Sequence, residues 1–87
     1  KLNDVIFKAY PNPAKNELNI HMVLTHNESY TIQILNTLGQ VVKTVTMVNL
    51  TPGMYNQVIN IADLNSGIYS VNVSGSKASG TQKLIID

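Results

Sequence analysis

Two histidines and five carboxylates are among the side chains in this sequence that could carry acid–base catalysis or hold a metal ion. His21 and His26 lie five positions apart, with Glu28 nearby. A zinc site needs three or four converging ligands, whereas two residues five apart on a strand face opposite sides. We therefore interpret both histidines as exposed surface residues, and we expect neither a metal site nor a bound cofactor.

The carboxylates do not form the pair that glycoside hydrolysis requires. A glycosidase needs two carboxyl groups that flank one bond inside a cleft. Here the acids are spread over separate turns and chain ends, and Asp63 is expected to steady a corner through an Asx-type hydrogen bond. The Gly-x-Ser-x-Gly turn typical of many serine hydrolases is also absent. We predict that the chain is not an enzyme.

The charge and composition of the chain exclude two further classes of function. Its net charge is +1, from six lysines and no arginine, and the lysines are scattered along the sequence. A nucleic-acid-binding protein needs a basic stripe that displaces counterions, so nucleic acid is not an expected partner. No apolar run approaches the roughly 18 residues of a membrane-spanning helix. Cysteine is absent, which excludes disulfides and thiolate ligands.

Carbohydrate binding remains an alternative, because many small β-domains bind sugars on exposed aromatic residues. The chain has no tryptophan, one phenylalanine and four tyrosines. Tyr30 and Tyr69 fall on strand faces that we assign to the core. Tyr10 and Tyr55 are the remaining candidates for a sugar-binding platform.

Strands must position all of these residues, because apolar and polar side chains alternate with a period of two along most of the chain. The clearest alternation runs over residues 16–25, where Leu18, Ile20, Met22 and Leu24 share one face. Further strands are expected at residues 4–10, 30–34, 40–48, 55–61, 69–74 and 81–86. No segment shows a convincing 3.6-residue period of helical length.

Turn-forming residues separate the expected strands. Pro11 and Pro13 cannot donate to a sheet ladder and end the first strand. Asn36 and Gly39 suit the first and last positions of a four-residue turn, since glycine accepts a positive φ. The strands on either side of this turn should form a hairpin.

The fold that these elements predict is all-β. Leu64, Gly67 and Tyr69 resemble a tyrosine corner, in which a tyrosine hydroxyl bonds to backbone upstream. Seven short strands with turns at roughly ten-residue intervals indicate a seven-stranded antiparallel β-sandwich, an immunoglobulin-like Greek key. We interpret residues 1–5 as the end of a linker and residues 6–87 as one domain.

Four short motifs follow one another along nearly the whole chain, from about Phe7 to Ile86. They are Tyr10–Ala14 followed by Leu18–Ile20; Ile34–Val42; Ile59–Ile61 with Leu64 and Gly67–Val73; and Lys83–Ile86. In this order and at this spacing they resemble the type A C-terminal sorting domain of the type IX secretion system. The family commonly has Asp at the position of Asn36 and Lys or Arg at the position of Gln40, so the second motif departs from the pattern there.

The resemblance implies a C-terminal signal that directs a larger cargo protein through the type IX system of a Bacteroidetes-type bacterium. The cargo is expected to fold in the periplasm and cross the outer membrane, and a sortase-like protease usually removes the domain. Expected partners are the outer-membrane translocon, the sortase components and the N-terminal cargo of the same polypeptide. The expected location is the medium or the cell surface. The alternative is a non-catalytic module on an extracellular enzyme, binding carbohydrate or protein.

Some residues are predicted to carry or to shape the signal. The last strand follows a Gly/Ser loop, and we expect that it can pair with a partner's sheet by strand addition. A dimer through exposed edge strands is a further possibility. The predicted signal or fold-defining residues are Pro11, Asn12, Pro13, Gly39, Gly67, Tyr69 and Lys83.

Overall fold

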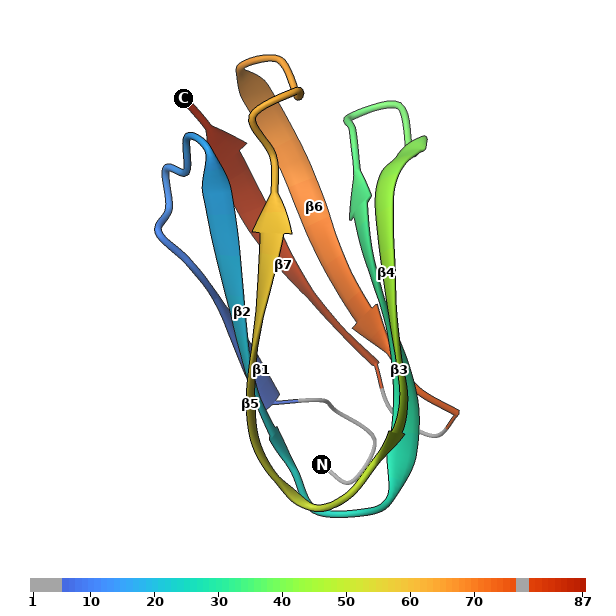
Figure 1. The fold of residues 1–87 in the computed structure, drawn as a ribbon. Coiled ribbons are helices and arrows are strands. Elements are labelled where there is room, and N and C mark those ends of the chain that lie inside the picture. The colour runs from blue at the N-terminus through green and yellow to red at the C-terminus, as the bar shows by residue number, and fades with distance from the viewer. Residues whose placement is uncertain (1–5, 77–78) are drawn as a thin grey trace.

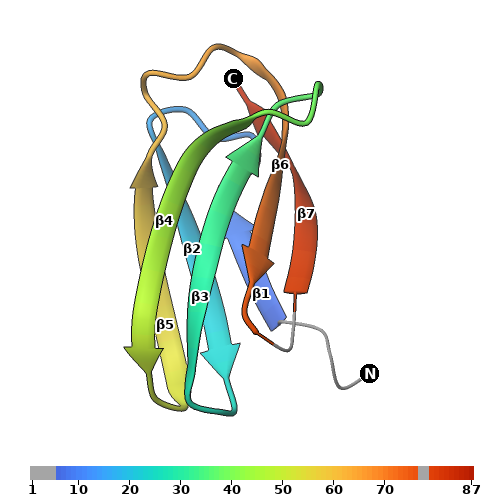
Figure 2. The same cartoon turned by 90° about the vertical axis from the view of Figure 1, so that its right-hand side faces the viewer.

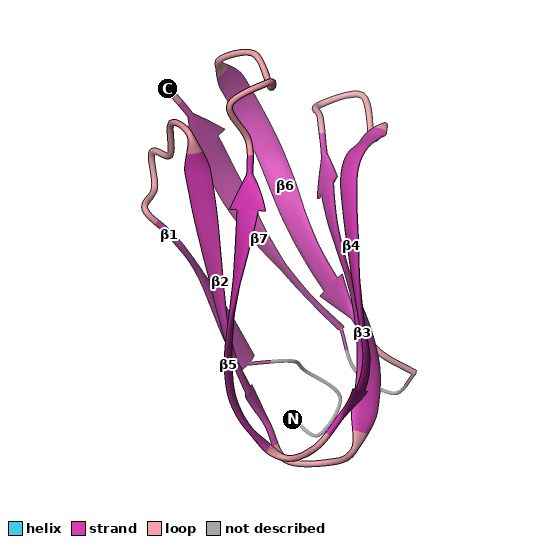
Figure 3. Cartoon of the chain, in the orientation of Figure 1, coloured by secondary structure: helices cyan, strands magenta, loops and turns pink. Residues whose placement is uncertain are grey.

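Seven strands account for nearly all of the regular structure in the computed structural model, which describes residues 6–76 and 79–87 (Figures 1 and 3). They are β1 (Ile6–Tyr10), β2 (Glu17–Leu24), β3 (Glu28–Leu35), β4 (Val41–Leu50), β5 (Gly53–Asn60), β6 (Gly67–Ser74) and β7 (Ser79–Ile86). Every expected strand is present, with ends that differ by a few residues. The described residues contain no helix that is long and apolar enough to cross a membrane.

The strands form two antiparallel sheets packed face to face, as predicted (Figure 2). One sheet has the order β1-β2-β5 and the other the order β4-β3-β6-β7. In the seven-stranded constant-type immunoglobulin arrangement the fourth strand lies beside the fifth, whereas here β4 pairs with β3. The edge strands β1 and β7 therefore lie on one side of the sandwich, and β4 and β5 lie on the other.

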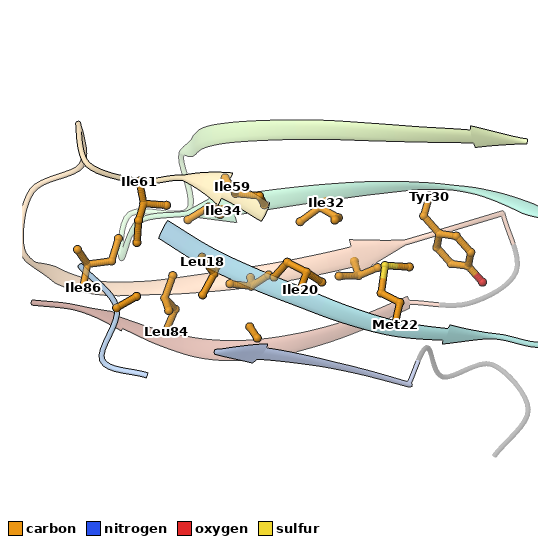
Figure 4. Packing of buried hydrophobic residues seen from close by; sticks show 14 of the residues in the cluster. Leu18, Ile20, Met22, Tyr30, Ile32, Ile34, Ile59, Ile61, Leu84 and Ile86 are labelled. Atoms are coloured by element: carbon orange, nitrogen blue, oxygen red, sulfur yellow. The ribbon is translucent and has the colours of Figure 1, made fainter. Parts of the chain in front are cut away.

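The core is built from the alternate residues that face inward from both sheets (Figure 4). Successive inward positions on β2 are fully buried, and β3 supplies Ile32 and Ile34 opposite them. Among the described residues, no polar or charged side chain is buried. Burial of apolar area at about 25 cal/mol per Å² is thus the main favourable term for this small domain. The buried core residues are Ala9, Ala14, Leu18, Ile20, Met22, Leu24, Tyr30, Ile32, Ile34, Ile59, Ile61, Val71, Val73, Leu84 and Ile86.

The connection from β5 to β6 is the tyrosine corner that the sequence predicts. The Tyr69 hydroxyl donates to the backbone oxygen of Asn65 at 2.8 Å, and the Leu64 N–H donates to Ile61 O at 3.0 Å. Gly67 opens β6 opposite Ile86 at the end of β7. The corner therefore fixes where β6 begins relative to β7.

Replacing the corner tyrosine tests this role. Tyr69→Phe keeps the ring and removes one hydrogen bond to backbone, so we expect the free energy of unfolding to fall by about 1 kcal/mol. Tyr10→Phe is the control, because the Tyr10 hydroxyl bonds to the exposed side chain of Asn56 and not to backbone among the described residues, and its effect should be smaller. Urea unfolding followed by circular dichroism measures both, and an equal loss in the two variants contradicts the assignment.

Candidate functional site

The loop after β1 that holds Pro11, Asn12 and Pro13, the hairpin turn that holds Gly39, and the corner that leads into β6 lie at one end of the sandwich (Figure 1). Gly67 and Tyr69 belong to the first residues of β6, and Lys83 lies on β7 opposite Ser70. This end, which we call the C-terminal pole, is formed by loop residues 11–16, 36–40 and 61–66 and by the last residues of β7. Strand β1 begins at the opposite end. Residues far apart in the sequence meet at this end, since Asn12 contacts the backbone of Lys83.

Asn12 joins the loop after β1 to the outer edge of β7. Its side-chain oxygen accepts from the Ile85 N–H at 3.0 Å, and its side-chain nitrogen donates to Lys83 O at 3.1 Å. The peptide bonds that precede Pro11 and Pro13 are both cis. The Asn12 amide thus takes the place of a strand residue beside β7.

Ala14 continues this pairing along the same edge. The Ala14 N–H donates to Ile85 O at 2.8 Å, and the Asp87 N–H donates to Ala14 O at 2.8 Å, which makes a parallel bridge. Ala14 is completely buried. The loop after β1 therefore leaves the three-stranded sheet and pairs with the four-stranded one.

Gln82, on β7, bonds to the backbone of β1 and so connects the edges of the two sheets on this side of the sandwich. The Ala9 N–H donates to the Gln82 side-chain oxygen at 3.2 Å, and the Gln82 side-chain nitrogen donates to Ala9 O at 3.0 Å. Sequence reasoning missed this residue. The sequence does contain an indication of it. Gln82 alternates in phase with Leu84 and Ile86, so its polar side chain is expected to face inward, where it needs a hydrogen-bond partner.

The bonds of Asn12 and Ala14 change the interpretation of β7 as a free edge. Edge strands expose unpaired N–H and C=O groups that can template another strand. On β7, the outward groups of Ile85, the Lys83 oxygen and the Asp87 N–H are already bonded within the chain. Strand addition to this half of β7 would first have to displace Asn12 and Ala14. The Lys83 side chain itself is exposed.

The hairpin turn between β3 and β4 forms another part of the pole. The Asn36 side-chain oxygen accepts from the N–H groups of Leu38 at 2.9 Å and Gln40 at 3.0 Å. Gly39 has a φ of 81°, which a residue with a Cβ rarely adopts. The two positions that depart from the family pattern contact each other, since the Asn36 nitrogen donates to the Gln40 side-chain oxygen at 2.9 Å. A neutral amide pair therefore stands where the resemblance implies an Asp and a Lys or Arg.

Exposed apolar side chains surround these polar residues at the pole. Leu38 is 81% exposed at the tip of the hairpin, and Val41 follows it at the start of β4. Ile68 and Ile85 are direct cross-strand neighbours and are 51% and 39% exposed. Sequence reasoning also missed this group, although both isoleucines alternate out of phase with the buried positions of their strands. Exposed apolar groups beside polar ones are typical of protein-binding surfaces.

The residues first considered for metal binding and catalysis are not brought together. His21 lies on the outer face of β2, and the His26 ring bonds to the neighbouring Thr25 hydroxyl, with the two atoms 3.0 Å apart. No group of three potential metal ligands occurs among the described residues. A shallow hollow at the end opposite the pole is lined by residues 27–29 and 49–51.

Asp63 and Lys43 form the ion pair of the pole. The Lys43 ammonium lies 2.9 Å from one carboxylate oxygen of Asp63 and 3.1 Å from the other. This hydrogen bond is the largest cause that holds the pKa of Asp63 below its ordinary value of 3.8. The carboxylate was expected to steady its own corner, and a hydrogen bond to its own backbone is the second cause of the lowered pKa, while the bond to Lys43 ties the β5–β6 loop to β4.

The fold is a small immunoglobulin-like sandwich, and the loop residues of its C-terminal pole form an exposed surface. The comparison with protein families agrees with this class. The chain belongs to the family of secretion system C-terminal sorting domains, whose model matches residues 8–87. Members of this family carry the type IX sorting signal, and the family is not a catalytic one. A search of curated proteins found no match.

Truncating Asn12 should selectively expose one backbone group of β7. In Asn12→Ala the Ile85 N–H loses its partner, so we expect its hydrogen exchange to accelerate while that of Leu84, in the ladder with β6, changes little. Loss of two hydrogen bonds should also lower the free energy of unfolding by about 1–3 kcal/mol. Asn27→Ala, in an exposed turn, is the control. Unchanged exchange at Ile85 would refute the role of Asn12.

Acid should weaken the link between Asp63 and Lys43. The pKa of Asp63 is lowered by folding, so the pair adds stability above pH 3.8, and that stability is lost as the pH falls through the lower folded-state pKa. We expect Asp63→Asn to remove this part of the acid dependence, with Glu17→Gln as the control. Carboxyl chemical shifts during a pH titration measure the effect, and a titration of Asp63 at or above pH 3.8 contradicts it.

Proposed function

We propose that this domain is the export signal of a larger cargo protein and that the type IX translocon at the outer membrane recognises it. The observation that carries the proposal is the family match over residues 8–87. In this proposal the cargo precedes the domain in the same polypeptide, and a sortase-like protease cuts between them. The cargo then reaches the cell surface or the medium, and the domain itself catalyses no reaction.

The arrangement of the pole supports recognition by a protein partner. The exposed apolar residues Leu38, Val41, Ile68 and Ile85 flank loops that are held rigid by amide hydrogen bonds. Rigid loops lose little conformational entropy when a partner binds. Because β1 begins at the opposite end, a translocon component bound at the pole leaves the cargo side of the domain uncovered.

A surface binding module is the second candidate, and one observation favours it. The Tyr10 hydroxyl donates to the Asn56 side-chain oxygen at 3.1 Å, and the Asn56 nitrogen donates to the Asn19 oxygen at 3.2 Å. Since Tyr10 is on β1 and Asn56 on β5, the phenol lies along the outer face above β2. Tyr55 fits a platform less well, because it is half-buried and its hydroxyl donates to Thr51 O at 2.6 Å. Binding of a glycan by the isolated chain, lost in Tyr10→Ala, would favour this function.

Export of a reporter tests whether the domain is an export signal. We fuse residues 1–87 to the C-terminus of a fluorescent protein with a periplasmic signal peptide, in a bacterium that has a type IX system. We expect the reporter in the surface and medium fractions of the wild-type strain and in the periplasm of a translocon-deficient strain. Retention of a folded fusion in the periplasm of both strains would contradict the proposal.

A matched pair of variants locates the recognition surface within the same assay. Ile68→Ser removes an exposed apolar side chain from the pole, and Met54→Ser removes one that is 74% exposed at the start of β5. Both changes spare the core, so both proteins should fold. We expect export to fall strongly with Ile68→Ser and to persist with Met54→Ser. The reverse pattern would place recognition at the opposite end.

A further inference from the structure

Strand β4 is apolar and yet contains no buried residue. Six of its ten residues are apolar, and every residue from Val41 to Leu50 is exposed or half-buried. Each of the other strands contributes at least one buried side chain to the core. Val42, Val45, Met47 and Leu50 are half-buried and pack against the core, whereas Val41 and Val48 are 47% and 61% exposed. As an edge strand with β3 on one side, β4 leaves apolar surface open on the other.

The backbone edge of β4 is also the least protected of the four sheet edges. Gln82 bonds to β1, Asn12 and Ala14 bond to β7, and the Gln57 side chain donates to Val58 O on the edge strand β5. On β4, within the described part of the chain, side-chain bonding to backbone is confined to Asn49 near the strand's end, whose N–H donates to the Ser29 hydroxyl at 3.1 Å. Residues 41–48 contain no proline or glycine that would block pairing.

The sequence of β4 is nearly the same in both directions about Val45. Threonines stand one position away on each side, the long side chains of Lys43 and Met47 two positions away, and valines three positions away. Two antiparallel copies of such a strand, related by a two-fold axis at Val45, pair each residue with one of similar shape. An isologous contact between identical subunits has this symmetry.

We propose that β4 pairs antiparallel with β4 of a second copy of this chain, with the two-fold axis at Val45. Thr44 then lies opposite Thr46 of the second copy, and Val42 lies opposite Val48. The two four-stranded sheets join into one continuous sheet. Opposed residues of an antiparallel pair lie on the same face. The threonines, which align with Thr31 and Gln33 of β3, therefore extend the outer face, and Val45, aligned with Ile32, extends the inner face.

Electrostatics favour a second copy over a charged partner. The net charge of +1 gives little repulsion between identical chains. Lys43 is the one charged residue of β4, and its ammonium is neutralised by Asp63 of its own chain. In the proposed register Lys43 lies opposite Met47, so the two lysines do not face each other.

Sedimentation of the 87-residue chain over a range of concentrations tests the dimer. We expect a monomer–dimer equilibrium for the natural sequence. Thr44→Lys combined with Thr46→Lys places like charges opposite each other at two symmetric points, and it should weaken dimerisation at least about tenfold. Both threonines are exposed, so the variant should fold, which circular dichroism verifies. Thr81→Lys on β7 is the control and should leave the dimer intact.

A charge swap tests the register itself. Thr44→Glu combined with Thr46→Lys places opposite charges across the interface, and dimerisation should survive and become sensitive to salt. In a second assay, a mixture of Thr44→Cys and Thr46→Cys chains should form a disulfide between the two variants, because directly opposed strand residues lie within disulfide range. Each variant alone should cross-link far less, and the chain has no natural cysteine to interfere.

Each outcome decides the proposal. A dimer that the double lysine variant disrupts and the charge swap preserves supports it. A natural chain that stays monomeric at every concentration overturns it. A dimer that persists with two lysines on β4, or that cross-links equally well in each single-cysteine variant, places the interface elsewhere and also overturns it.

Discussion

Closure of one side of the sandwich by two side-chain amides is the constraint on which the rest of this structure depends. Each sheet buries one face in the shared core, but burial does nothing for the backbone groups at the four sheet edges. Asn12 and Gln82 satisfy those groups on β7 and β1. With that side closed, the loop after β1 is fixed against the end of β7, and the pole becomes a defined surface.

The sequence predicted the strands, the sandwich and the corner because these features follow from local rules. Alternation places Leu18, Ile20 and Met22 in the core, and the spacing of Leu64, Gly67 and Tyr69 predicts the corner. The pairing of β4 with β3 followed from their short turn. The bonds of Asn12 and Gln82 could not be predicted in this way, because they join positions 71 to 73 residues apart. That Asp63 bonds to Lys43 in addition to its own backbone could not be predicted either, because the two residues lie 20 positions apart.

The molecule has two unlike sides and two unlike ends. The β1–β7 side is closed by internal bonds, while the β4–β5 side keeps an unprotected strand. The loops that hold Asn12 and Gly39 lie at the C-terminal pole, and the chain enters β1 at the other end (Figure 1). A short domain can therefore present one surface for recognition and another for association, without either one obstructing the polypeptide that precedes it.

The direction of β1 has a mechanical consequence. If the pole is held and the chain before β1 is pulled, the force acts along the strand. Its ladder bonds to β2, which run across the strand, are then loaded in shear and share the load. The Ala9–Gln82 pair and the bonds of the loop to β7 lie on the same path. Tension on the cargo side thus meets several bonds in parallel, which is the geometry that best resists unravelling of a strand from its end.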